Sequence, residues 1–331
     1  MDRKHKILVL VVALLAYLVV FPMLFSSRNY VLGVMTTASV LAVISSGVWL
    51  IFYIGRINIG QGAFALIGGY AAAIAMSKWG WSFWVAMPFA GLATMAMGIL
   101  LGLPLLRLKG VYFSMITMCL TETARLTALN LKSITNGPNG ILNLPLPGEL
   151  SLFGITIIPD FATVDKHLAM YYLSACLLIV AFAVMYRIVN SRIGWLFRSL
   201  QQNEELASSF GVNVPKLRVI AFAICTFYAG IGGAFFVAMQ QSIYPTSFTV
   251  QDSTYFLLYC FLGGLGYVFG PLIGTFFLYI SFEALQGYNE YQPLIYALLM
   301  IFMMLWLPNG MLSVFSFLKK KRPSVAAGGE K

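Results

Sequence analysis

The chain alternates between long apolar runs and short polar segments. A helix needs about 20 consecutive apolar residues to cross a bilayer, and ten runs approach that length. The ten runs are 7–25, 30–54, 60–76, 83–103, 110–131, 168–188, 217–239, 253–269, 271–286 and 291–308. The pattern therefore predicts an all-α polytopic membrane protein with about ten transmembrane helices.

Composition agrees with this fold class. Hydrophobic residues make up 60% of the chain, charged residues only 10%, and the mean hydropathy is +0.85. A soluble domain has roughly a quarter of its residues charged. The net charge of +10 does not indicate a nucleic-acid partner, because the basic residues lie in loops and tails rather than along one helix face. Membrane lipid is the expected surrounding, and no nucleic acid is expected.

The distribution of Lys and Arg predicts the orientation, because cytoplasmic loops carry an excess of both. With the N-terminus inside, most of them fall in cytoplasmic segments. The exceptions are Arg125, within a span, and four residues outside, Arg28, Lys78, Lys132 and Lys166. We expect both termini in the cytoplasm, one transmembrane domain over 1–318 and a basic tail over 319–331.

Two of the ten runs, 60–76 and 253–269, are short and rich in Gly or Ala. Omitting either would move a strongly basic segment outside, so we expect both to cross. Ten spans form two halves of five, and an odd number per half predicts inverted topology. The two weak spans are each third in their half, a position that points to a substrate path in transporters.

Glu122 and Arg125 are charged residues inside the predicted span 110–131. They are three residues apart and therefore share one face of a helix. Charges at this depth are costly unless they pair or face protein or water. Two interpretations stay open: a structural pair that locks helices together, and a pair that lines a permeation path.

An outside loop follows this span and contains Asn136, Gly137, Asn139 and Gly140. Asn and Gly tolerate the positive φ angles of tight turns. The backbone amides of these turns could hold an anion, or the loop could be a plain turn at a helix end.

A late Gly-rich segment contains five glycines that we expect to pack helices together. They are Gly263, Gly264, Gly266, Gly270 and Gly274. The last three recur every four residues, as in close helix pairs. The Gly263–Gly264 pair and Pro271 are expected to break or bend the helix.

Catalytic and metal sites are not indicated. The four cysteines lie in apolar runs without metal-site spacing, the only histidines are His5 and His167, and no GxxxxGK[ST] phosphate loop occurs. We therefore expect a chain that is not an enzyme and binds no metal and no cofactor of its own.

The polar segment 189–216 lies between two spans and is predicted to be cytoplasmic. Within it, residues 204–210 can form a short helix that ends at Gly211, and Pro215 separates this helix from the next span. Leu206 and Phe210 stand among acidic and serine residues. Such a short amphipathic helix suits docking into a groove on another protein, with a solvated loop as the alternative.

At these places the chain resembles the membrane permeases of branched-chain amino-acid ABC importers, in the LivM-like branch. The cytoplasmic acidic segment of importer permeases reads NEELASSFGVN here, with Leu206 in place of Ala. The intramembrane Glu-x-x-Arg, the outer TNGPNG loop, the late GGLGYVFGPLIG and the early GQGAF…GGY also match. Gln61, Asn136 and Tyr267 depart from the family pattern. The resemblance spans about residues 30–312.

The resemblance implies a role for each group of residues. The ATPase-coupling loop would comprise Arg198, Glu204, Glu205, Ala207, Gly211 and Asn213. The candidate translocation path would comprise Gln61, Gly68, Tyr70, Glu122 and Arg125. The implied partners are a homologous permease, two cytoplasmic ABC ATPases that use ATP and Mg, and a periplasmic solute-binding protein, all at the bacterial inner membrane.

Alternatives remain at this point. The substrate could be urea, a short amide or another amino acid, because a related importer branch shares much of the pattern. A stand-alone secondary transporter or channel would explain ten spans in inverted halves. It would not explain the ordered acidic-then-Gly loop.

Overall fold

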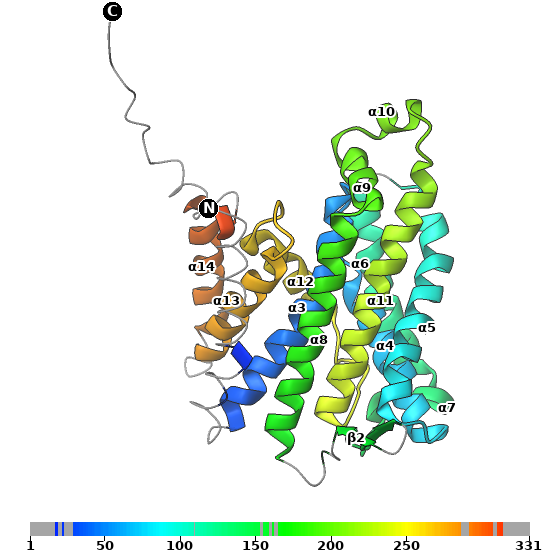
Figure 1. Cartoon of the computed structure of the whole chain (residues 1–331), viewed down its shortest axis with the longest axis vertical. Helices are drawn as coiled ribbons and strands as arrows, with labels where there is room; N and C mark the ends of the chain where they lie inside the picture. Colours follow the sequence, from blue (N-terminus) through cyan, green and yellow to red (C-terminus); the bar gives the residue numbers. More distant parts are fainter. Residues whose placement is uncertain are drawn as a thin grey trace, which may run out of the picture.

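The computed structural model describes residues 17–18, 22, 29–108, 110–152, 155–158, 161, 165–285, 291–306 and 310–313. The long helices run roughly side by side in a bundle (Figure 1). The short helices α9 and α10 lie at one end of this bundle, and α7 and a small hairpin lie at the other.

The described part of the chain is helical apart from its connections and one antiparallel hairpin, β1 with β2. The elements are α3 (Asn29–Tyr53), α4 (Gln61–Lys78), α5 (Phe83–Leu105), α6 (Val111–Asn130), α7 (Lys132–Thr135), η2 (Gly137–Asn139), β1 (Leu150–Leu152), β2 (Ile155–Ile158), α8 (Lys166–Val189), α9 (Arg192–Gln202), α10 (Glu204–Ser209), α11 (Val214–Gln240), α12 (Val250–Gly263), α13 (Gly270–Ala284) and α14 (Gln292–Trp306).

Helices occupy the predicted spans closely. The second to seventh, the ninth and the tenth predicted spans each coincide with a helix to within one turn at both ends. The predicted first span, 7–25, lies outside the described residues except at three positions. Four helices, α3, α5, α8 and α11, are long and apolar enough to cross a membrane by length and composition. The count of ten crossings, the inverted halves and the side of the termini stay predictions.

The predicted span 253–269 is not one continuous helix. Helix α12 ends at Gly263, and Gly264 follows with a φ of 110°. Such a backbone conformation is readily adopted by glycine and ends a right-handed helix. A short turn then leads into α13, which has Pro271 in its first turn. The predicted break at the glycine pair and proline is therefore confirmed, and it falls inside the expected span.

The late glycines do not form one row on one helix. Gly266 lies in the turn, and a Cβ atom there would meet nothing within 4 Å. Gly274 lies on α13, where a Cβ atom would come within 1.9 Å of the Tyr259 carbonyl oxygen on α12. The expected close packing therefore holds between α12 and α13 and does not involve Gly266.

Helix α11 is central to the bundle and packs most extensively against α5, α4 and α3. Small residues in the GQGAF…GGY segment of α4 and the YAGIGGA segment of α11 make this possible. A Cβ atom at Gly68 would lie 2.4 Å from the Gly230 Cα, and one at Gly233 would lie 2.0 Å from the Ala65 carbonyl oxygen. The backbones of α4 and α11 are thus in direct contact.

We expect Gly68→Ala to lower the melting temperature of the purified protein. The added methyl group has no room against Gly230, so α4 and α11 must separate, at a cost of about 1–3 kcal/mol. Gly33→Ala in α3 is the matched control, because nothing lies within 4 Å of a Cβ atom there. Equal melting temperatures for the two variants would contradict the α4–α11 contact.

Candidate functional site

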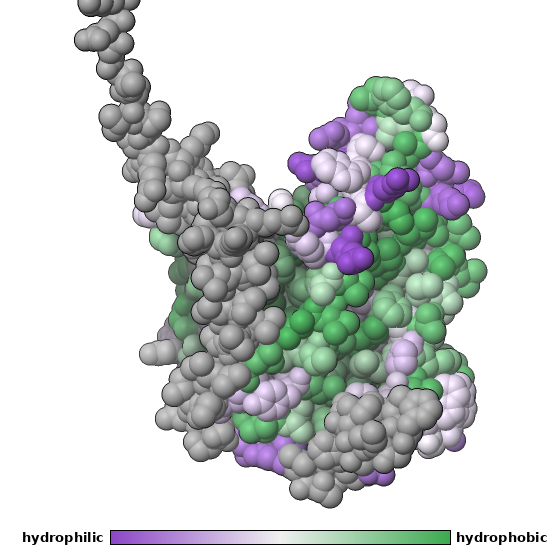
Figure 2. All heavy atoms as spheres, in the orientation of Figure 1, coloured by the Kyte–Doolittle hydropathy of each residue, from purple (hydrophilic) through white to green (hydrophobic). Residues whose placement is uncertain are grey.

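Hydrophilic residues gather at the end of the molecule that carries α9 and α10, whereas the flank of the bundle is mainly hydrophobic (Figure 2). This end contains the segment predicted to be the cytoplasmic coupling loop. The residues at this end belong to α9, α10 and the start of α11. They form polar contacts with the connection between α3 and α4 and with the connection between α5 and α6.

Side-chain caps define the short helix α10. The Asn203 side chain accepts hydrogen bonds from the amides of Glu205 and Leu206, each at 3.0 Å. Beyond its other end, Gly211 has a φ of 79°, which an L side chain adopts only with strain. Asn213 then caps α11 by accepting from the Lys216 amide at 3.1 Å. The predicted short helix ending before Gly211 is confirmed.

Apolar side chains project from α10 into solvent. Leu206 is 57% exposed and Phe210, directly after the helix, is 80% exposed. Glu205 and, on α9, Arg198 are exposed as well, while Ala207 is buried against the bundle. Exposed large apolar residues rimmed by polar ones mark interaction surfaces.

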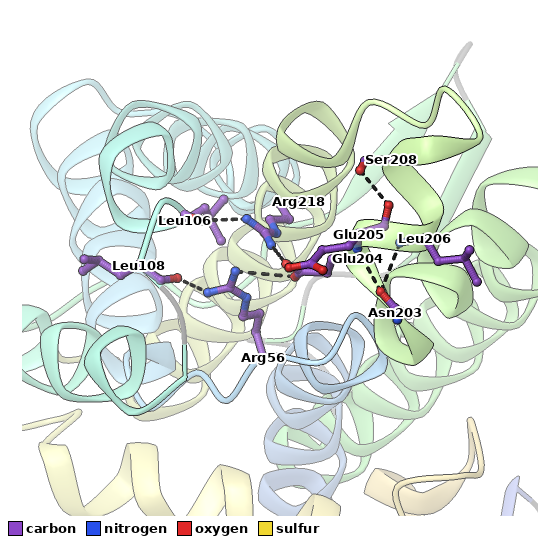
Figure 3. Close-up of polar contacts among 9 residues, drawn as sticks. All are labelled: Arg56, Leu106, Leu108, Asn203, Glu204, Glu205, Leu206, Ser208 and Arg218. Atoms are coloured by element: carbon purple, nitrogen blue, oxygen red, sulfur yellow. Dashed lines mark hydrogen bonds and ion pairs between the residues drawn. The ribbon is translucent and has the colours of Figure 1, made fainter.

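Glu204 points the other way, into the bundle (Figure 3). Its carboxylate forms ion pairs with two arginines, Arg56 at 3.5 Å and Arg218 in direct contact. Both arginines are buried, with exposures of 4% and 8%. Arg56 comes from the α3–α4 connection and Arg218 from α11, so one carboxylate joins α10 to two separate parts of the bundle.

The two arginines also contact the connection between α5 and α6. Arg56 Nη1 donates to the Leu108 carbonyl, and Arg218 Nη1 donates to the Leu106 carbonyl at 3.3 Å. The Arg56 guanidinium also lies 5.9 Å from the centre of the Phe113 ring, at the start of α6. The cluster of Arg56, Glu204 and Arg218 therefore joins α10 to the ends of α3, α4, α5, α6 and α11.

Two guanidinium groups share a single carboxylate in this cluster. Burial, and next the charge of Arg218, lowers the pKa of Arg56 from its ordinary value, while Glu204 opposes this shift. An arginine stays protonated in proteins, so the cluster keeps a positive excess. In the part of the chain that the structure describes, the Arg218 Nε atom is buried without a hydrogen-bond partner. Glu204 is therefore essential to the electrostatic balance of this end.

Sequence reasoning did not assign Arg56 and Arg218 to the site. Both were counted only among the basic residues whose distribution predicts the orientation. A usable signal was present for Arg56, since it is the single charged residue between the apolar runs 30–54 and 60–76. Nothing local to Arg218 distinguishes it from the other basic residues near it.

The predicted ion pair between Glu122 and Arg125 forms. Arg125 Nε donates to both Glu122 carboxylate oxygens at 3.0 and 3.1 Å, and Arg125 Nη2 donates to Oε1 at 2.5 Å. The Glu122 side chain is 43% exposed and that of Arg125 26%, on the outer side of α6. Whether the pair lines a path stays a prediction.

The other path candidates lie inside the subunit. Gln61 is fully buried, and its Nε2 donates to the carbonyls of Ile44 and Cys225 at 3.0 and 3.2 Å. Gly68 packs on α11, and Tyr70 is 5% exposed. These three residues thus face the packed interior, whereas Glu122 faces outward from the subunit.

The outer loop forms a tight turn. Asn136, Gly137 and Gly140 have φ angles of 67°, 61° and 64°, and Asn139 ends the short helix η2. The amide of Asn136 donates to the Lys132 carbonyl, that of Gly137 to the Thr135 hydroxyl, and that of Gly140 to the Gly137 carbonyl. These donors are engaged internally, which favours the plain turn over an anion site.

Comparison with known proteins gives a consistent result. The family described as branched-chain amino acid transport system, permease component, matches residues 30–306. The LivM permease of the high-affinity branched-chain amino acid transport system is 31% identical in Salmonella typhimurium, over 93% of this chain and 75% of that protein. The Escherichia coli LivM is also 31% identical, over 91% and 74%.

A more distant relative is named for a different substrate. The ribose import permease RbsC of Escherichia coli is 23% identical, over 92% of this chain and 94% of that protein. No solved structure matches the chain. With a match over most of its length and apolar helices long enough to span a bilayer, the chain belongs to the family of branched-chain amino acid transport permeases, which are multi-pass membrane proteins.

Proposed function

We propose that the chain is the transmembrane permease subunit of an ATP-driven importer for branched-chain amino acids in the bacterial inner membrane. It would work with a homologous permease, two cytoplasmic ABC ATPases and a periplasmic solute-binding protein. The names of the relatives with 31% identity support this substrate over ribose, whose permease is 23% identical. Family membership favours this assignment over a stand-alone transporter or channel.

The observation that carries the proposal is the two-sided construction of α10. On its outer side, Leu206 and Phe210 present exposed apolar surface to a partner. On its inner side, Glu204 is bound to two buried arginines of the bundle. A helix that contacts a partner on one side and is fixed to the transmembrane helices on the other can transmit displacement between them.

The mechanism follows from these contacts. ATP and Mg act on the ATPase subunits, whose closure displaces α10. Through Glu204 the displacement reaches Arg56, next to the start of α4, and Arg218, in α11. Because the backbones of α4 and α11 are in direct contact near Gly68, these helices move as one body. The importer would thereby alternate between outward-open and inward-open states.

We expect Phe210→Ala to weaken binding of the ATPase subunits. Removing a central exposed aromatic anchor typically costs about 2 kcal/mol or more, which is roughly a 30-fold increase in Kd. Tyr244→Ala is the control, because Tyr244 is also exposed but follows the opposite end of α11. The measurement is co-purification with the ATPases, followed by titration. Unchanged ATPase binding in Phe210→Ala would contradict docking at α10.

We expect Glu204→Ala to separate ATPase binding from transport. The exposed Leu206 and Phe210 remain, so the ATPases still bind, but α10 loses its ion pairs with Arg56 and Arg218. Glu149→Ala is the control, because Glu149 is an exposed acidic residue directly before β1, at the other end of the bundle. The readouts are leucine uptake and ATP hydrolysis in proteoliposomes, with less leucine transported per ATP only in Glu204→Ala.

The same variant should unfold at a lower temperature. Removing one partner of a fully buried ion pair costs roughly 3–5 kcal/mol, and the loss here is expected to be smaller. The reason is that 25% of the Glu204 side chain is exposed. Wild-type coupling and stability in Glu204→Ala would refute the role of the cluster.

A further inference from the structure

Helix α6 has two different faces. One packs on the bundle through Phe113, Thr117 and Thr121, all fully buried. The opposite face is open along the length of the helix. Its exposed residues include Tyr112, Met115, Cys119 and Leu126, and the half-exposed side chain of Glu122 lies among them.

The open face changes character along its length. Toward the end near α10 it is apolar, with Val111, Tyr112 and Met115 more than half exposed. Past the middle it carries the Glu122–Arg125 pair. Next to the pair lies an open surface of the same helix, formed by Thr123, Leu126, Thr127 and Asn130, with Leu131 directly after it.

The second half of the open face, from Glu122 onward, does not suit contact with lipid hydrocarbon. Charged side chains within membrane helices face protein or a water-filled cavity, because hydrocarbon cannot solvate them. The threonines and Asn130 beside the pair add hydrogen-bonding groups to the same surface. The open face of α6 therefore fits a wet boundary between two permease subunits better than a lipid contact.

The pair is also free to exchange partners. Among the described residues, Glu122 and Arg125 hydrogen-bond through their side chains only to each other. Arg125 uses Nε and Nη2 for this purpose, which leaves the Nη1 donors available. The arginines of the α10 cluster differ, since backbone carbonyls of another connection fix them in place.

We propose that the Glu122–Arg125 pair binds the charged groups of an amino acid as it passes along the open face of α6. Arg125 takes the α-carboxylate, because a guanidinium binds a carboxylate through two parallel hydrogen bonds. Glu122 takes the α-ammonium group. Leu126 and Leu131 of the adjacent open surface contact the aliphatic side chain.

This site deepens the proposed function and rests on it, since it presupposes an amino-acid permease. The exchange of partners is neutral in charge: one internal ion pair opens, and two ion pairs with the zwitterion form. Because the internal pair competes with the substrate, binding is weak and release is easy. A permeation site needs this property.

Native cysteines test the location of the site. Cys119 and Cys176 are exposed, and Cys225 and Cys260 are buried. Cys119 shares the open face with Glu122, whereas Cys176 lies on α8 between exposed apolar residues, Tyr172 and Val180. The variant Cys176→Ser therefore keeps Cys119 as its accessible thiol, on the proposed path. The variant Cys119→Ser keeps Cys176 as its accessible thiol, on an apolar flank.

We expect a charged methanethiosulfonate reagent to modify Cys119 at least about tenfold faster than Cys176 in the complete importer in membranes, because thiolates form in water. L-leucine should slow modification of Cys119, and Glu122→Gln should abolish that protection. Equal rates at the two cysteines, or protection that survives Glu122→Gln, would overturn the proposal.

A charge exchange separates recognition from a structural ion pair. The double variant Glu122→Arg with Arg125→Glu restores an ion pair on α6, so a purely structural role predicts normal leucine uptake. Recognition predicts normal membrane insertion with uptake reduced at least about tenfold, because the groups that bind the carboxylate and the ammonium have changed places. Wild-type uptake in the exchanged variant would refute recognition while leaving the proposed function intact. Absence of leucine uptake by the unmodified importer would instead refute the proposed function.

Discussion

The ion pairs of one carboxylate hold the polar end of this protein together. Glu204 lies on a six-residue helix that has too little length to be stable by itself. Its carboxylate contacts two buried arginines, which in turn bind backbone carbonyls of the α5–α6 connection. Without Glu204, two buried positive charges would face each other. The attachment of α10 to the bundle and the geometry of three connections depend on this contact.

The helix bundle is closely packed along the middle of α4 and α11. Near Gly68 and Gly230 the backbones of α4 and α11 touch, and no side chain separates them. Close packing of this kind transmits displacement, because it has little room to deform. Helix α12 differs, since it ends at Gly263 and gives way to a turn before α13. The bundle thus combines a closely packed centre with an interrupted helix at its side.

Helix α6 connects the two proposed functional regions of the chain. Its first turn holds Phe113 against Arg56, and its middle carries the Glu122–Arg125 pair. A movement of the α10 cluster therefore acts directly on the helix that we propose to contact substrate. The proposed coupling and recognition sites are joined by one continuous helix rather than by a chain of loops.

Much of the architecture could be predicted from the sequence, because apolar runs and helix-ending residues act locally. The bounds of α3 to α6, α8 and α11, the short helix before Gly211 and the break near Pro271 all follow from such signals. The Glu122–Arg125 contact follows from a spacing of three on one helix. Tertiary structure alone decided that Glu204 faces inward, that Arg56 and Arg218 meet it, and that Gln61 is buried. These contacts join residues far apart in the chain, and local pattern carries no information about which distant charges will share one buried site.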